Sequence, residues 1–353
     1  MSFAPGADLH GEGVRVRRTG IVSVTTTSPE SEDFTLLVAP YRRELLAHCY
    51  RMLGSVDDAE DQVQETLLRA WRSYSDFEGR SSLRTWLHRI ATNSCLRALE
   101  TRSRRPLPSG LGGPAKDPAS PPAPSLDIPW LQPVPDSLVP DRAEDPASVV
   151  TSRASLRLAL IAALQHLPAR QRAALILRDV LGWHAAEVAD LLGTSVPAAN
   201  SALQRARAHI ASLAPAEDDI GEPDDPGILD LLARYAAAFE TADVAGLTEL
   251  LREDATLEMP PLPGWFAGRP AVSRFLGTHV LLRPGDFLFV PVRANARPAF
   301  AVYQRDGDGN QHAHAIQVLG IRRGQIASIV SFNDGALLRW FGLPGIALPA
   351  LDR

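Results

Sequence analysis

The sequence predicts a multidomain protein, with two all-helical domains followed by an α+β domain. Three observations support this prediction. Apolar side chains recur at helical spacing in two blocks, residues 31–105 and 146–214. A proline-rich stretch over 106–145 separates the blocks, and such a composition is typical of a linker. The last part, 227–353, begins with helical periodicity and then alternates as strands do.

The length and composition fit a folded protein and exclude several classes. At 353 residues, the chain is long enough for two or three domains. No apolar run is long enough to cross a bilayer, so we expect no membrane segment. The two cysteines, Cys49 and Cys95, have no metal-binding or redox spacing, so we expect a cytoplasmic protein. Residues 1–30 lack periodicity and predict a flexible tail.

Charge is distributed unevenly along the chain, although the net value is −5. Residues 80–105 carry seven arginines against Glu100 alone, a local charge of +6. Residues 146–214 carry seven arginines against three acids, a local charge of +4. A second linker, 215–226, is acidic and contains six carboxylates. Two basic domains separated by an acidic connector are compatible with nucleic-acid binding, which the net charge alone would disfavour.

The first helical block predicts two amphipathic helices joined by a short loop. The first helix covers about 58–74 and has acids in its first turn, where the helix dipole favours them. The second covers about 82–99, and its polar side repeats every four residues: Arg89, Asn93 and Arg97. Such a basic face with an Asn and nearby aromatic rings can bind phosphates and unstacked bases. An ordinary solvated helix face is the alternative.

The segment DAEDQVQETLLRAWRSYSDFEGRSSLRTWLHRIATNSCLRAL resembles region 2 of an extracytoplasmic-function (ECF, group 4) sigma factor of the sigma-70 family. In that family the first helix docks on the clamp helices of the RNA polymerase β′ subunit. The following loop and helix melt and capture the minus-ten promoter element. The resemblance implies these polymerase-binding residues: Asp58, Asp61, Gln62, Glu65 and Arg69. It also implies these minus-ten contacts: Phe77, Trp86, Arg89, Asn93 and Arg97.

The implied minus-ten contacts have two roles. Phe77 and Asn93 would hold a flipped-out base, whereas Arg89 and Arg97 would contact the DNA backbone. Unstacking a base costs a few kcal/mol, and a protein pocket can offset that cost.

The second helical block has the spacing of a helix-turn-helix unit. A short helix over about 183–192 is followed by a turn at Gly193, and Ser195 is a suitable N-cap for the next helix. That helix has an apolar face and an opposite face that is polar and basic. A helical hairpin in an all-α domain is the alternative.

The segment LPARQRAALILRDVLGWHAAEVADLLGTSVPAANSALQRARAHI resembles sigma region 4, which recognises the minus-thirty-five element in the major groove. The resemblance implies these DNA contacts: Asn200, Ser201, Gln204, Arg205 and Arg207. Many relatives carry a basic residue where Asn200 stands, so no base preference is carried over. The implied partners are promoter DNA and core RNA polymerase, through its β′ clamp helices and its β subunit. Tethering the two regions makes the second DNA contact effectively intramolecular.

The linker contains an apolar segment, Ile128–Pro133, within polar surroundings. It either packs on a neighbouring domain or, as in the family, threads into polymerase near the active-site cleft.

The C-terminal part predicts two helices and then a curved antiparallel sheet, an α+β cone. Strands are expected near 286–294, 298–305, 312–322 and 325–332. This pattern resembles a SnoaL-like domain of the NTF2-like superfamily, whose sheet wraps a pocket. A small-molecule ligand in that cone is one implied partner.

Enzymatic relatives of such a cone use an acid/base pair inside it. The candidates here are Glu258, His279, His312 and His314, but no carboxylate–histidine pair stands at a diagnostic spacing. We therefore expect no catalytic residue, no metal and no cofactor. The alternative function is an NTF2-like enzyme that converts a small molecule and is fused to a DNA-binding module. A helix-turn-helix repressor that acts without polymerase is a third.

Two apolar and aromatic segments, 259–269 and 333–344, are typical of a docking surface, with core packing as the alternative for their aromatic rings. They resemble segments of ECF sigma factors with a fused SnoaL-like domain. There the extension regulates the sigma core in cis, replacing or supplementing a separate anti-sigma factor. The implied regulatory contacts are Trp265, Phe266, Asn333, Asp334 and Gly335. A glycine-rich Asp-Gly motif of some of these proteins is reduced here to the last three.

The sequence therefore predicts an alternative RNA polymerase sigma factor that directs promoter recognition, DNA melting and transcription initiation. Its C-terminal domain is expected to regulate sigma activity in cis.

Overall fold

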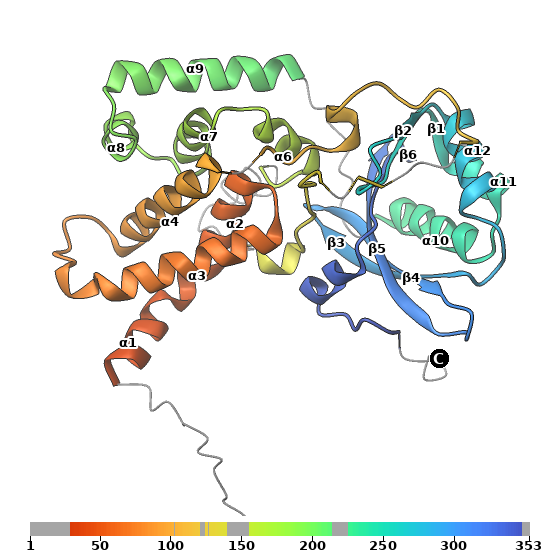
Figure 1. Cartoon of the computed structure of the whole chain (residues 1–353), viewed down its shortest axis with the longest axis horizontal. Coiled ribbons are helices and arrows are strands. Elements are labelled where there is room, and N and C mark those ends of the chain that lie inside the picture. The colour runs from red at the N-terminus through yellow and green to blue at the C-terminus, as the bar shows by residue number, and fades with distance from the viewer. Residues whose placement is uncertain are drawn as a thin grey trace, which may run out of the picture.

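The computed structural model describes residues 29–101, 103–120, 124–125, 127–139, 155–213 and 225–347 (Figure 1). The predicted tail lies outside the described residues except for its last two, and so does most of the acidic linker. The predicted fold class is confirmed: helical domains come first, and an α+β domain follows. Within the described ranges, none of the helices is both long and apolar enough to cross a bilayer.

The first domain is a bundle of four helices. They are α1 (Pro29–Val38), α2 (Arg42–Leu53), α3 (Val56–Arg72) and α4 (Leu83–Glu100). Ser55 begins α3 by accepting a hydrogen bond from the Asp58 backbone N–H at 3.1 Å, and Ser82 begins α4 in the same way. Gly54 ends α2 at φ +72°, a left-handed conformation that favours glycine. These caps align α3 and α4 side by side.

The second domain contains the helix-turn-helix unit. Its helices are α6 (Leu158–Gln165), α7 (Ala169–Leu175), α8 (Ala185–Leu191) and α9 (Val196–Leu213), and a π-helical turn (Ile176–Val180) follows α7. Gly193 makes the turn between α8 and α9 at φ +58°. The Ser195 hydroxyl accepts a hydrogen bond from the Ala198 N–H at 3.3 Å at the start of α9. The predicted helix over 183–192 is thus shorter at its start, because His184 occupies the N-cap.

The third domain is built on a six-stranded sheet with the order β2-β1-β6-β5-β4-β3. The strands are β1 (Leu251–Glu258), β2 (Trp265–Ala267), β3 (Phe287–Ala294), β4 (Arg297–Arg305), β5 (Gln311–Arg322) and β6 (Gln325–Phe332). All pairs are antiparallel except β1 with β6. The helices are α10 (Pro226–Glu240), α11 (Val244–Leu250) and α12 (Arg269–His279), and a 3-10 helix, η6 (Gly335–Phe341), follows β6.

The two faces of the sheet belong to different cores. Phe289, Phe300 and Leu319 pack on one face with residues of α10 and α12, which fill the concave side of the cone. The side chains of Ile316 and Val318 lie on the convex face, in the cluster that also contains the cores of both helical domains. One continuous apolar core therefore joins the convex face to the helical domains.

The linker between the helical domains is held in place, although its described residues contain no long helix or strand. Leu131 and Val134 are fully buried in the shared core. Two tight turns, Pro108–Gly110 and Asp136–Leu138, shape its path. Of the two alternatives for the apolar segment Ile128–Pro133, packing on neighbouring domains is the one that this structure contains.

Candidate nucleic-acid interface

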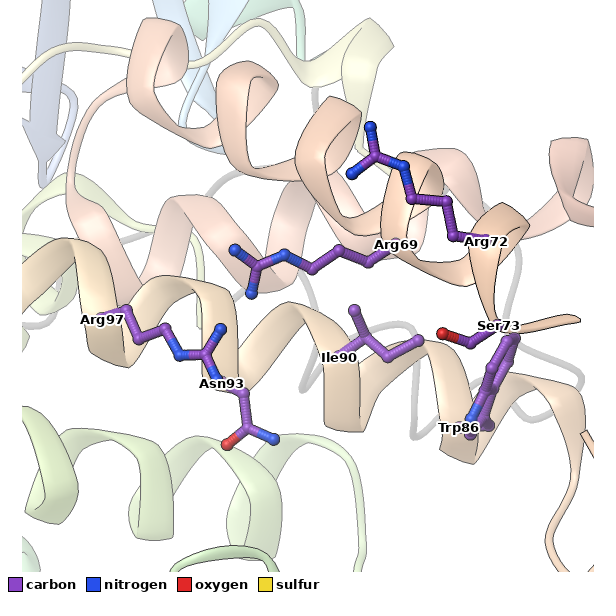
Figure 2. Close-up of a pocket in the computed structure, with 7 residues that line it drawn as sticks. All are labelled: Arg69, Arg72, Ser73, Trp86, Ile90, Asn93 and Arg97. Carbon is purple, nitrogen blue, oxygen red and sulfur yellow. The ribbon is translucent and has the colours of Figure 1, made fainter. Parts of the chain in front are cut away.

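A cavity of about 330 Å³ lies between α3 and α4 on the surface of the first domain. Its lining residues are Arg69, Arg72, Ser73, Trp86, Ile90, Asn93 and Arg97 (Figure 2). Figure 2 shows the Arg69 side chain of α3 extending along the gap beside α4, which supplies the indole and the amide. Guanidinium groups bind phosphate, an aromatic face stacks on a base, and an amide can hydrogen-bond to a base edge. This set of groups is suited to an unstacked nucleotide.

A row of aromatic side chains extends from Trp86, which lines the cavity. Phe77 lies 4.8 Å from Trp86 between ring centroids and 6.3 Å from Tyr74. Trp71 and Tyr74 both contact Phe34 of α1 in turn. Phe77 itself is half-buried and does not line the cavity. Of the two residues predicted to hold a base, the structure thus places Asn93 in the cavity and Phe77 beside it.

Arg89 is engaged by the second domain. Its guanidinium forms an ion pair with Asp190 of α8 at 2.6 Å, between residues 101 positions apart in the chain. The Arg89 side chain is 35% exposed and Asp190 is 69% exposed, so solvent screens the pair. A residue predicted to contact DNA is therefore held by an acid of the same chain.

The predicted minus-thirty-five residues share an exposed face of α9. Asn200, Ser201, Gln204 and Arg205 are exposed, whereas Ala199, Leu203 and Ala206 are buried. Arg207 is exposed as well, but its guanidinium makes two hydrogen bonds with the Asp179 carboxylate, at 2.5 and 3.0 Å. The structure thus brings these five residues together on one helix.

The predicted polymerase-binding residues follow one side of α3 but differ in their surroundings. Asp58 is only 13% exposed and forms an ion pair with Arg105. Asp61 is exposed, and Glu65 pairs with Arg69 one turn along. Arg69 also lines the cavity to which Asn93 and Arg97 of α4 contribute. The start of α3 is thus covered by other parts of the chain, whereas its later turns are more exposed to solvent.

The predicted regulatory residues of the third domain divide between surface and core. Trp265 donates a hydrogen bond from Nε1 to the Gly112 carbonyl of the linker at 2.8 Å. Phe266 is buried and stacks on Phe275 within the cone, at 4.4 Å between centroids.

The Asn333-Asp334-Gly335 motif has contacts within its own domain. Asn333 bonds to Pro260 and Ser331, Asp334 caps η6, and Gly335 passes close to Ala313.

The sequence did not indicate the contacts that join the third domain to α3. Arg339 and the Trp340 indole both donate hydrogen bonds to Oδ1 of Asp57 at 2.7 Å, and Gln132 of the linker donates to Oδ2 at 2.9 Å. Burial raises the pKa of Asp57, but these hydrogen bonds outweigh it and lower the pKa below its usual value. The acids at the start of α3 were visible in the sequence, but their partner, 282 residues away, was not.

The candidate acid and bases of the cone do not form a catalytic group. Glu258 stands in register with Val330 of the convex face, so its side chain points away from the cone interior. It accepts a hydrogen bond from the Ser109 N–H at 2.8 Å, and burial raises the pKa of its carboxyl. His279 donates a hydrogen bond to the Ala119 carbonyl. These two residues contact the linker.

The two histidines of β5 are also separated. His312 pairs with Asp306 at 2.7 Å at the hairpin turn. His314 is the extra residue of a β-bulge, because Ala313 and Ala315 pair with adjacent residues of β4. It packs near Phe287, and burial lowers its pKa. In the described parts of the chain, no three His, Cys, Asp or Glu residues are placed to hold a metal.

Comparisons with known families match all three domains. Residues 37–105 match Sigma-70 region 2, residues 157–210 match Sigma-70 region 4, and residues 232–338 match the SnoaL-like domain.

Comparisons with individual proteins agree. ECF RNA polymerase sigma factor SigG of Mycobacterium tuberculosis is 52% identical over 314 residues, which cover 88% of this chain and 84% of the relative. SigJ of the same organism is 32% identical over 61% of each chain. The crystal structure of SigJ superposes with a TM-score of 0.55 at 24% identity, over 88% of this chain and 98% of that one. These relatives are sigma factors and not enzymes, so the enzymatic alternative is not favoured.

Proposed function

Because this chain belongs to the ECF RNA polymerase sigma factors, we propose that it binds core polymerase through α3 and captures promoter DNA in two places. The cavity between α3 and α4 takes an unstacked base of the minus-ten element, with Asn93 on the base edge and Arg97 on the backbone. The exposed face of α9 enters the major groove at the minus-thirty-five element. The observation that carries the proposal is the cavity, which three arginines, an amide and an indole line together. Its place of action is the cytoplasm, where polymerase transcribes.

We further propose that this conformation is a closed state held by the third domain. The two promoter elements lie about 25 base pairs apart, or about 85 Å of duplex. Yet Arg89 of the minus-ten helix contacts Asp190 of α8, which packs on α9. An 18-residue helix is about 27 Å long. The two DNA-binding surfaces are therefore too close to contact both elements, and the domains must separate first.

The third domain is placed to prevent that separation, because it contacts α3, the linker and the start of region 4 together. Regulation in cis then consists of holding region 2 against region 4. The closed state also explains why Asp57, at the start of a polymerase-binding helix, is engaged by the third domain.

Two further partners, a small-molecule ligand and a separate anti-sigma factor, are secondary to this direct packing between domains. A small molecule in the cone would have to separate aromatic rings, because Tyr235, Phe239 and Phe300 are at most 2% exposed. A separate anti-sigma factor would cover surfaces that this chain already covers with its own C-terminal domain. We therefore propose direct contact between domains as the main means of control.

The experiment is a pull-down with core polymerase followed by run-off transcription from the chain's own upstream region. We expect the full chain to bind core enzyme and to produce a transcript of defined length. The variant Asn93→Ala should still bind core enzyme but lose at least ten-fold in transcript, because the cavity loses its base-edge contact. Asn310→Ala, in an exposed turn of the third domain, is the control and should transcribe normally. Equal transcript from Asn93→Ala and the unaltered chain would contradict the proposed site.

A further inference from the structure

The tip of the β3–β4 hairpin lies where region 2, the linker and region 4 meet. Asn295, at this tip, donates from Nδ2 to the Tyr50 hydroxyl of α2 at 2.8 Å. The same nitrogen donates to the Leu156 carbonyl at the start of region 4, also at 2.8 Å. Its backbone N–H donates to the Val134 carbonyl at 3.0 Å, and its Oδ1 accepts from the Val134 N–H at 3.1 Å. One side chain thus joins three segments that are distant in sequence.

The position requires an asparagine on two separate grounds. Asn295 and Ala296 have φ of +55° and +58°, the backbone of a tight hairpin turn, and asparagine is among the residues that tolerate this region. Asn295 is also 0% exposed, and an amide supplies two donors and an acceptor, which match the groups around it. An aspartate would place a carboxylate against the Leu156 carbonyl.

The tip is not needed to build the cone. Ala294 and Ala299, which flank the turn, belong to the shared core with the helical domains and not to the aromatic core of the cone. Around the turn, Asp136 of the linker accepts a hydrogen bond from the Ala296 N–H at 2.8 Å and pairs with Arg293 at 3.2 Å. All of these contacts lie between domains, so their effect is on how the domains are held together.

We propose that this hairpin tip is the latch of the closed state, and that its withdrawal from the site formed by Tyr50, Val134 and Leu156 allows region 2 and region 4 to separate. The three segments that it joins are the ones that must move apart on opening. Withdrawal leaves the Val134 N–H and the Leu156 carbonyl without Asn295, and a buried polar group without a partner is costly. The hydrogen bonds of Asn295 therefore oppose the separation of region 2 from region 4. The consequence for transcription rests on the proposed sigma function, but the latch itself does not.

The test is single-molecule energy transfer between dyes on region 2 and region 4 of the full chain. Arg80→Cys and Ala208→Cys introduce exposed labelling sites, while the native Cys49 and Cys95 are fully buried. In this background, Asn295→Gly retains the positive φ and the backbone N–H but removes the three side-chain hydrogen bonds. We expect the ratio of open to closed molecules to rise about ten-fold, which corresponds to about 1.4 kcal/mol.

The matched control is Ala296→Gly in the same turn. It also introduces a glycine at positive φ but removes no polar group, so the ratio should stay within two-fold. Tyr50→Phe removes the hydroxyl from the other side of the contact and should shift the ratio in the same direction as Asn295→Gly. It serves as the second variant if Asn295→Gly does not fold.

An unchanged ratio in Asn295→Gly, or in Tyr50→Phe where the first variant is unfolded, overturns the latch. So does an equal rise in Ala296→Gly. Neither polymerase nor DNA is present, so this outcome is independent of whether the chain acts as a sigma factor.

Discussion

Two histidines meet in the core of region 2. The rings of His48 and His88 lie edge to face at 5.3 Å, and each is at most 1% exposed. Among the described residues, His48 Nδ1 and His88 Nε2 have no hydrogen-bond partner. Burial, His88 and Arg51 hold the pKa of His48 well below its usual value. Burial also lowers the pKa of His88, although Glu44 partly opposes it. Both rings are therefore neutral in the folded domain.

This pair makes the stability of the protein depend on pH. An unfolded histidine takes up a proton near pH 6.5, whereas the folded domain with lowered pKa values does not. The free energy of unfolding should therefore have its full value above about pH 7. It should fall as the pH drops below about 6.5, by up to about 1.4 kcal/mol per pH unit for each histidine. Urea unfolding at pH 7.5 and pH 5.5 measures the difference.

The variant His48→Gln should reduce this pH dependence, because an uncharged amide replaces one buried imidazole. His209→Gln, at an exposed position of α9, should change it much less, since His209 acts only as a minor cause of the lowered pKa of His166. Burial also lowers the pKa values of His166 and His314, so some dependence should persist in His48→Gln. An identical pH slope in His48→Gln and the unaltered chain would show that the pair does not titrate as described.

At the scale of helices and strands, the local sequence pattern predicted those elements whose position depends on that pattern alone. Four of the five long strands of the sheet, β3 to β6, lie within about two residues of their expected positions, because alternation of apolar residues fixes them. The strand β2 was not expected, since it has three residues and exists through pairing with β1. In the described residues of the linker, the proline-rich composition agrees with the short turns that the structure contains. It could not show that Leu131 and Val134 are buried, because their partners come from other domains.

The step from β6 into η6 depends on a close approach of two backbones. A Cβ on Gly335 would lie 2.2 Å from the carbonyl oxygen of Ala313 on β5, which neither backbone can avoid without moving. Gly335→Ala should therefore reduce the free energy of unfolding of the third domain by about 1–3 kcal/mol. Gly345→Ala is the matched control, since its added methyl group meets nothing within 4 Å. Thermal unfolding followed by circular dichroism compares them, and equal melting temperatures would contradict the close packing.

At the scale of the whole molecule, the sequence pointed to the candidate DNA-binding surfaces but not to the arrangement of the domains that carry them. The face of α9 followed from a helical repeat, and Asn93 followed from family resemblance. The ion pair of Arg89 with Asp190 and the bonds of Asn295 could not be anticipated, because each joins residues more than 100 positions apart. Such contacts depend on how domains pack, and periodicity within one segment carries no information about that.

We expect the proposed closed state to weaken polymerase binding measurably. Asp190→Asn removes the charge that holds Arg89, and an exposed ion pair contributes about 0.2–1 kcal/mol. Apparent affinity rises with the fraction of competent molecules, so the variant should bind core polymerase up to about five-fold more tightly. Fluorescence anisotropy of the labelled chain gives the dissociation constants. Asp230→Asn, which alters an exposed acid of α10, is the control and should bind as the unaltered chain does.

Equal affinity for Asp190→Asn and the control would show that this ion pair does not restrain region 2.

The shared core has a consequence for how such a protein can open at all. The convex face of the sheet is apolar, with Ala301, Ile316 and Val318 at most 2% exposed against the helical domains. A third domain that simply detached would present this surface to water, at about 25 cal/mol for each Å² uncovered. It would also become prone to aggregation. Opening is therefore better described as an exchange of surfaces, which is favoured when a newly arrived partner covers what the helical domains leave.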